Sequence, residues 1–287
     1  MLPETDIILN PFKHKYGVKD FFEHFSLKIK SPSISFLQDI LNCYMVFPYE
    51  NISKIIKLNK ENKSNELIRL PEEIINDHKN FNLGGTCFSL TYFLQSILTL
   101  HGFKCYPVMA NMRNRPNVHC VLIVILNNSK YLVDPGYLLT LPVELKFNKP
   151  IICSTSYSNI ELIFNRKDKH FHLYTSDRIQ KKWRYCFQDR SVSSENFLRF
   201  WENSFYQGTM HGICLNQIRG NEMFYIHNDY FQITSIKGKQ KTRIKENYHS
   251  IIREIFSISP ELVEQAQAAI SGNIKIKKPI SFFESNE

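Results

Sequence analysis

Apolar residues recur at three- and four-residue intervals through about the first hundred positions, and this spacing predicts helices. One predicted helix ends near Phe47-Pro48 and carries the stripe Ile34, Leu37, Ile40, Leu41, Tyr44 and Met45. Another begins at Pro71, which suits a first helical position and is followed by two acidic residues. The polar stretch at 57–66, KLNKENKSNE, lies between them and is expected to be a solvated surface loop.

The segment 86–100, TCFSLTYFLQSILTL, is apolar around most of a helical surface, which predicts a buried helix. Thr86 is a residue type that favours the N-cap position, and Gly102 favours the end of a helix. We therefore expect a helix that begins immediately after Thr86.

Between about 103 and 190 the pattern changes to alternation of apolar and polar residues, which predicts strands. The runs VHCVLIVIL and YLVD flank the turn-like NNSK and are expected to form one antiparallel hairpin. After 200 a hairpin around Arg219-Gly220-Asn221 precedes two helices, the last beginning at Ser259-Pro260. The predicted class is α+β, with a helical bundle at 1–102, an antiparallel β-barrel or curled sheet at 103–200 and an α/β lid at 201–287.

Composition and charge narrow the classes of protein without choosing a function. Of the 287 residues, 43% are hydrophobic, which is typical of a globular protein. The net charge of +9 favours anionic partners, such as molecules that carry phosphate groups. Seven widely spaced cysteines form no Cys-x-x-Cys pair, so a reduced, cytoplasmic setting is expected. The apolar run at 118–126 is far shorter than a membrane span, and we expect neither a membrane nor a nucleic acid as partner.

The candidate chemistry lies at Cys87, His119 and Asp134. Cys87 follows Gly84-Gly85-Thr86 at the start of the buried helix, where the positive end of the helix dipole favours a thiolate. His119 and Asp134 lie in the predicted hairpin, so the three side chains match a nucleophile, its base and the residue that orients the base. The Gly85 amide is a candidate donor to an oxyanion. Each of the three residues, taken alone, has an ordinary structural explanation. Their combination in this order is much more specific for catalysis than any one of them.

These residues resemble the arylamine N-acetyltransferase family. Its signature places Gly-Gly-x-Cys before a helix, then a strand His, then an Asp fifteen positions later, as Cys87, His119 and Asp134 stand here. An upstream Pro-Phe-Glu-Asn-Leu element corresponds to residues 48–52, PYENI. Residues 181–187 and 251–259 are similar to the family's later strand and C-terminal helix, so the resemblance covers nearly the whole chain.

The resemblance implies a papain-like Cys-His-Asp arrangement and two-step acyl transfer. Cys87 would accept an acetyl group from acetyl-CoA, a consumed co-substrate, and an arylamine, hydrazine or other amine would then take it. No metal is implied. By their positions in the motif, Tyr49, Gly136 and Tyr137 would line the acceptor pocket.

The chain also departs from the family pattern. Leu83 stands where an Arg is usual, so Glu50 needs another partner, such as Arg113 or Arg115. Ser89 replaces a Glu or Gln, and the family's Asp-Val-Gly-Phe-Gly becomes Asp-Pro-Gly-Tyr-Leu at 134–138.

Two other functions remain open on the sequence. A thiol hydrolase or transglutaminase-like enzyme uses the same three residue types, and an inactive binding module would retain only the scaffold. His170 and His172 share a strand face, but without a third ligand we expect surface residues.

Overall fold

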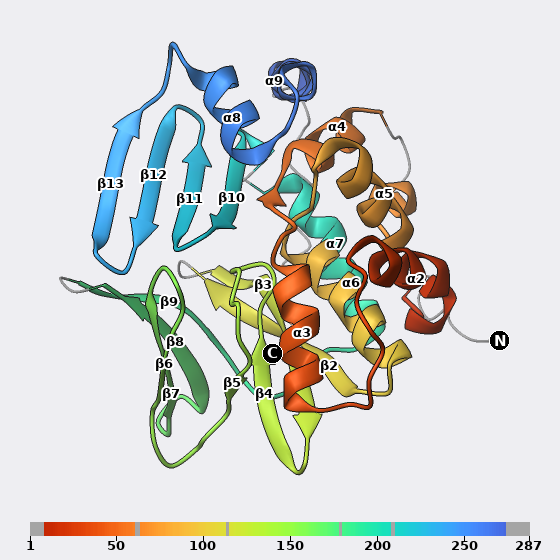
Figure 1. The fold of residues 1–287 in the computed structure, drawn as a ribbon, viewed down its shortest axis with the longest axis vertical. Coiled ribbons are helices and arrows are strands. Elements are labelled where there is room, and N and C mark those ends of the chain that lie inside the picture. Colours follow the sequence, from red (N-terminus) through yellow and green to blue (C-terminus); the bar gives the residue numbers. More distant parts are fainter. Residues whose placement is uncertain (1–8, 61–63, 113–114, 178–179, 208–209, 274–287) are drawn as a thin grey trace, which may run out of the picture.

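A computed structural model of the chain describes residues 9–60, 64–112, 115–177, 180–207 and 210–273. Helices dominate the first third and lie together on one side of the molecule (Figure 1). They are η1 (Pro11–His14), α2 (Lys15–His24), α3 (Ile34–Tyr44), α4 (Ile52–Lys60), η2 (Ser64–Leu67), α5 (Pro71–Phe81) and α6 (Cys87–Leu100). The order confirms the helical character predicted for this part.

The ends of these helices follow the expected local chemistry. Ser33 Oγ accepts a hydrogen bond from Phe36 N and caps α3, and Pro71 occupies the first turn of α5. Gly102, with φ at 80°, closes α6 as expected. The predicted loop at 57–66 is wrong at both ends, because residues 57–60 continue α4 and residues 64–66 begin η2. Lys57 pairs with Glu73, and residues 61–63 lie outside the described part of the chain.

The middle of the chain folds into an antiparallel sheet of eight strands in the order β5-β4-β3-β2-β9-β8-β7-β6. The end strands β5 and β6 lie close together, so the sheet is a nearly closed barrel. The strands are β2 (Lys104–Met112), β3 (Arg115–Leu126), β4 (Ser129–Val133), β5 (Val143–Glu144), β6 (Ile151–Ser154), β7 (Asn159–Asn165), β8 (His170–Ser176) and β9 (Lys181–Phe187).

The predicted hairpin of the barrel is confirmed. β3 pairs antiparallel with β4, and Leu126 lies opposite Ser129. The connecting Asn127 and Asn128 both have positive φ, 48° and 62°, as a tight two-residue hairpin turn requires.

A second sheet, of order β1-β10-β11-β12-β13, lies above the barrel in Figure 1. The hairpin predicted after 200 corresponds to β10 and β11. The chain turns again at residues 228–229, so two further strands, β12 and β13, extend the sheet. The elements are β1 (Tyr49–Glu50), α7 (Ser194–Asn203), η3 (Ser204–Tyr206), β10 (Cys214–Arg219), β11 (Glu222–His227), β12 (Tyr230–Ser235), β13 (Gly238–Arg243), α8 (Tyr248–Phe256) and α9 (Pro260–Asn273).

Hydrophobic clusters join the three parts of the chain. One cluster packs Ile52, Ile55 and Leu83 against residues of α8 and α9, and another packs α7 on α6. The division at 102 and 200 therefore remains a prediction. None of the helices in the described ranges is long and apolar enough to cross a bilayer.

Candidate active site

Cys87 is the first residue of α6 and lies buried, with 7% of its surface exposed. Thr86 takes the N-cap position, yet within the described residues its side chain accepts no capping hydrogen bond. Ser89 Oγ instead donates to the Thr86 carbonyl at 3.0 Å. The first amides of α6 are thus left to interact with negative charge beside Cys87.

His119 and Asp134 form a buried pair across the β3–β4 hairpin. His119 Nε2 lies 2.8 Å from Asp134 Oδ2, while Asp134 Oδ1 accepts a hydrogen bond from Tyr137 N at 2.9 Å. The ring of Tyr185 packs 5.0 Å from that of His119. Both oxygens of the Asp134 carboxylate are thus hydrogen-bonded, and this fixes the orientation of the His119 ring. The Nδ1 atom of His119 is left to interact with Cys87.

Cys87 and His119 interact directly, and each shifts the pKa of the other. Hydrogen bonds from Cys120 and His119, together with the His119 charge, hold the pKa of Cys87 well below its usual value although burial opposes this. Burial alone lowers the pKa of His119, but Asp134 and the Cys87 thiolate outweigh it and raise that pKa to about 10. Both shifts favour the thiolate–imidazolium form of the pair.

Two contributors to this pair were missed by the sequence analysis. The buried Cys120 thiol follows His119 on β3 and hydrogen-bonds to Cys87, and the ammonium of Lys54 on α4 adds a positive charge. A lysine on the inward stripe of α4, between Asn51 and Leu58, was the available signal for Lys54.

The two glycines before Cys87 are required by close packing. A Cβ on Gly84 would lie 2.0 Å from the Pro48 carbonyl oxygen, and one on Gly85 would lie 2.3 Å from Ser89 Oγ. Gly85 N donates to Pro48 O at 3.3 Å. This bond corrects the expectation that the Gly85 amide meets an oxyanion, because the amide is already used to hold the loop against β1.

The turn after Asp134 presses against the reactive residues. A Cβ on Gly136 would lie 2.6 Å from Cys87 Cβ and 3.1 Å from His119 Cε1, so only glycine fits. Leu138 stands where the family has its second glycine and adopts φ at 57°. Its burial and the hydrogen bond from Tyr157 Oη to its carbonyl at 2.8 Å stabilise this strained conformation.

The structure places Tyr49 and Tyr137 near the site from two directions. Tyr49 lies in β1 and forms a parallel bridge with Gly85, two residues before Cys87. Tyr137 follows Gly136, and the Arg184 guanidinium lies 5.8 Å from the centre of its ring. Their contribution to an acceptor pocket remains a prediction.

Glu50 is paired with Arg69, which the sequence analysis did not single out. Arg69 Nη1 lies 3.4 Å from Glu50 Oε1 and donates to Gly84 O at 2.7 Å, while Nη2 lies 2.6 Å from Asp77. Burial lowers the pKa of Arg69, but Glu50, Glu73 and Asp77 together raise it above its usual value. Arg115, one proposed replacement, is exposed, and Arg113 lies outside the described residues.

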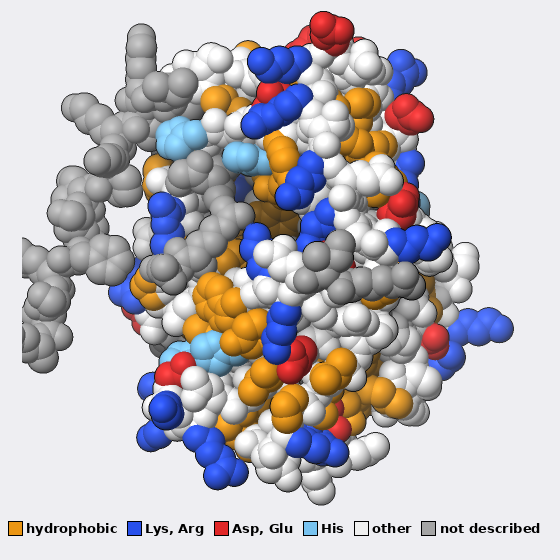
Figure 2. Space-filling view, turned by 90° about the vertical axis from the view of Figure 1, so that its left-hand side faces the viewer, with side chains coloured by type: hydrophobic (Ala, Val, Ile, Leu, Met, Phe, Trp, Pro, Cys, Tyr) orange, Lys and Arg blue, Asp and Glu red, His pale blue; other side chains and the backbone are white. Residues whose placement is uncertain are grey.

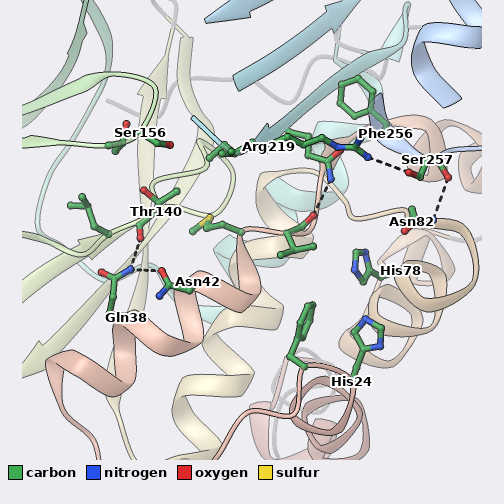
Figure 3. A pocket seen from close by; sticks show the side chains of 18 of the residues that line it. His24, Gln38, Asn42, His78, Asn82, Thr140, Ser156, Arg219, Phe256 and Ser257 are labelled. Atoms are coloured by element: carbon green, nitrogen blue, oxygen red, sulfur yellow. Dashed lines mark hydrogen bonds between the residues drawn. The ribbon is translucent and has the colours of Figure 1, made fainter. Parts of the chain in front are cut away.

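A separate cavity of about 860 Å³ lies where the helical part, the barrel and the second sheet meet. Its wall includes Gln38, His78, Thr140 and Arg219, shown in Figure 3, and contains none of the three reactive residues. Figure 2 shows a hollow with Lys and Arg side chains around it.

The described residues contain no group of three His, Cys, Asp or Glu side chains arranged to hold a metal ion. His172 Nε2 lies 2.8 Å from Asp168 Oδ2, and His172 Nδ1 accepts a hydrogen bond from Trp183 Nε1 at 3.0 Å. Both ring nitrogens are thus occupied by protein partners.

Comparisons with known proteins give a family match and a fold match. The family model described as N-acetyltransferase matches residues 33–264. An uncharacterised acetyltransferase of Acanthamoeba polyphaga mimivirus is 36% identical over 76 residues, which cover 25% of this chain and 34% of that protein. The chain thus matches about a third of the length of this relative.

Solved structures support the fold. The arylamine N-acetyltransferase from Mycobacterium abscessus superposes with a TM-score of 0.77 at 13% identity, covering 92% of this chain and 97% of that one. The enzyme from Mycobacterium marinum in complex with CoA gives 0.72 at 14% identity, covering 89% and 98%. These likenesses confirm the α+β class with an antiparallel barrel.

Proposed function

Given that this chain belongs to the arylamine N-acetyltransferase family, we propose that it moves an acetyl or other acyl group from an acyl-CoA to an arylamine, hydrazine or other amine. The observation that carries the proposal is the buried set of Cys87, His119 and Asp134, with the 2.8 Å contact between His119 and Asp134 and the lowered pKa of Cys87. A preformed thiolate is the form of cysteine that attacks an acyl carbon.

In the first half of the reaction the Cys87 thiolate attacks the thioester carbonyl carbon of the acyl-CoA. The carbon–sulfur bond to coenzyme A breaks, and the leaving thiolate receives the proton held by His119. The product is an acyl thioester on Cys87. We assign the oxyanion to amides in the first turn of α6, in place of the Gly85 amide.

In the second half an amine attacks the Cys87 thioester and gives its proton to the now neutral His119. Collapse releases the amide product and restores the thiolate–imidazolium pair. Asp134 keeps the imidazole in the orientation that both steps need, since its second oxygen is anchored by Tyr137 N.

The substrate assignments rest on several supporting features. The Mycobacterium marinum structure that this chain resembles contains CoA, and the net charge of +9 with the basic rim in Figure 2 suits phosphate groups. Tyr49, Gly136 and Tyr137 are our proposed acceptor-site residues. The seven cysteines are free, which supports the predicted cytoplasmic setting.

Intact-protein mass spectrometry tests the proposal. The purified chain is mixed with acetyl-CoA, or a panel of other acyl-CoAs, without an acceptor, alongside Cys87→Ala. We expect one acyl adduct on the wild type alone, which disappears when an arylamine is added. Failure to form an adduct with every acyl-CoA contradicts acyl transfer, and cleavage of a peptide amide instead would identify a thiol hydrolase.

A further inference from the structure

Lys54 is a buried lysine whose positive charge acts on the nucleophile. It lies in the middle of α4 with 5% of its surface exposed. Its Nζ donates to Ser204 Oγ at 2.6 Å and lies 4.4 Å from the centre of the Phe205 ring. Phe205 belongs to the same hydrophobic cluster as Cys87. An ammonium in such surroundings is costly unless another charge compensates it.

Neutral groups provide the direct contacts of Lys54. In the described part of the chain it forms no ion pair with a carboxylate. Glu50, one turn earlier, is held by Ser53 and Arg69, and Lys57, one turn later, pairs with Glu73. Burial lowers the pKa of Lys54 to about 7, and the charge that opposes this is the Cys87 thiolate.

Lys54 adds a further positive charge to the site, and this charge lowers the pKa of Cys87. The Cys87 thiolate and the Asp134 carboxylate carry two negative charges, and the His119 imidazolium carries one positive charge. A net negative charge in a buried site is poorly stabilised, because water is excluded and the local dielectric constant is low. In its ammonium form Lys54 offsets the remaining negative charge, and the Cys87 thiolate in turn favours that form.

We propose that Lys54 is a positioning residue of this catalytic centre, whose ammonium keeps Cys87 in its thiolate form before an acyl donor binds. The group acts through Cys87 and contacts no reacting carbon. This inference rests on the proposed function in one respect, since the thiolate is taken to be the nucleophile. When Cys87 is acylated its negative charge disappears, so the Lys54 ammonium loses its counter-charge and becomes the less stable form.

The rate of Cys87 alkylation by iodoacetamide, measured against pH without acyl-CoA or amine, tests the proposal. Peptide mass spectrometry reports modification at Cys87 separately from the other cysteines. In Lys54→Met we expect the midpoint of the profile to rise by about one pH unit, the lower end of the effect of a nearby opposite charge. Lys54→Arg, which keeps the charge, should restore a low midpoint. Lys60→Met, at the exposed end of α4, is the matched control and should behave as wild type. An unchanged midpoint in folded Lys54→Met would overturn the proposal.

A measurement on the wild-type protein keeps the test decisive if Lys54→Met misfolds. NMR of protein labelled at the lysine ε-carbons follows the titration of the Lys54 amine before and after alkylation of Cys87, with Lys54→Arg used for assignment. We expect the Lys54 midpoint to fall after alkylation. The same midpoint in both states would contradict the proposal. Because neither experiment uses acyl-CoA, a failure of acyl transfer would leave these outcomes unaffected.

Discussion

Arg69 Nη1 lies 3.4 Å from Glu50 Oε1, and the same nitrogen donates to the carbonyl of Gly84 at 2.7 Å. The pair therefore ties β1 to the loop that presents Cys87. The guanidinium reaches this place from the segment before α5. Leu83, at the position where the family usually has its arginine, is instead buried in an apolar cluster with Ile52.

Replacing Arg69 should destabilise the fold. In Arg69→Met the buried Glu50 and the partly buried Asp77 lose their partner, and removing one member of a buried ion pair costs about 3–5 kcal/mol. We expect the free energy of unfolding in urea to fall by that amount. Arg115→Met removes an exposed arginine and should change it by less than about 0.5 kcal/mol. Equal stabilities of the two variants would show that Glu50 is satisfied by other groups.

Gly136→Ala should inactivate the nucleophile. The added methyl group would lie 2.6 Å from Cys87 Cβ and 2.9 Å from Cys87 Cα, so the turn and α6 must separate. We expect slower alkylation of Cys87 and a loss of about 1–3 kcal/mol in unfolding free energy. Gly272→Ala, where no heavy atom lies within 4 Å of the added methyl, is the control. Wild-type alkylation in Gly136→Ala would mean that the contact is readily relieved.

Asp134→Asn should place the imidazole proton on the wrong nitrogen. Because Asp134 Oδ1 accepts from Tyr137 N, the amide nitrogen of Asn would face His119 Nε2, which must then be unprotonated. His119 could no longer take the proton of Cys87, and single-turnover acyl transfer should slow by about 10³–10⁴-fold. Asp168→Asn, which changes a surface Asp–His pair, should leave the rate unchanged. A wild-type rate in Asp134→Asn would exclude this role for Asp134.

His78 should make the protein sensitive to mild acid. Burial lowers the pKa of His78 from 6.5 to about 4. The hydrogen bond from its Nδ1 to the Leu83 carbonyl, at 3.3 Å, opposes this shift but is the smaller effect. Below pH 6.5 the unfolded chain binds a proton that the folded chain does not, so stability falls as the pH drops from 6.5 toward 4. Over this pH window the free energy of unfolding should fall by about 3 kcal/mol.

The check is urea unfolding across that pH window for the wild type and His78→Phe. Phenylalanine keeps an aromatic ring beside Phe47, whose centroid lies 4.3 Å from that of His78, but does not titrate. We expect the wild type to lose about 3 kcal/mol more than the variant between the two ends of the window. Parallel curves would show that His78 titrates normally.

The features that were predicted correctly depend on short stretches of sequence. Cys87 at a helix start and His119 with Asp134 in one hairpin are fixed by apolar periodicity, a glycine pair and a two-residue turn. Arg69 was missed because its partner Glu50 lies 19 residues away and no local pattern links them. Lys54 was missed because its partners are Ser204, 150 residues away, and the thiolate itself. The strand at 238–243 was missed because its polar residues do not show the alternation that identifies a buried strand.

Asn51 gives the fold a long-range connection next to the nucleophile. Its Nδ2 donates to Gly212 O at 2.8 Å and its Oδ1 accepts from Cys214 N at 2.8 Å, across more than 160 residues of sequence. Through β1 this connection reaches Gly85, which shares a bridge with Tyr49. During synthesis on the ribosome, the loop before Cys87 therefore emerges long before the strand that completes its support. A growing chain that ends before β10 therefore holds the loop before Cys87 without these two hydrogen bonds.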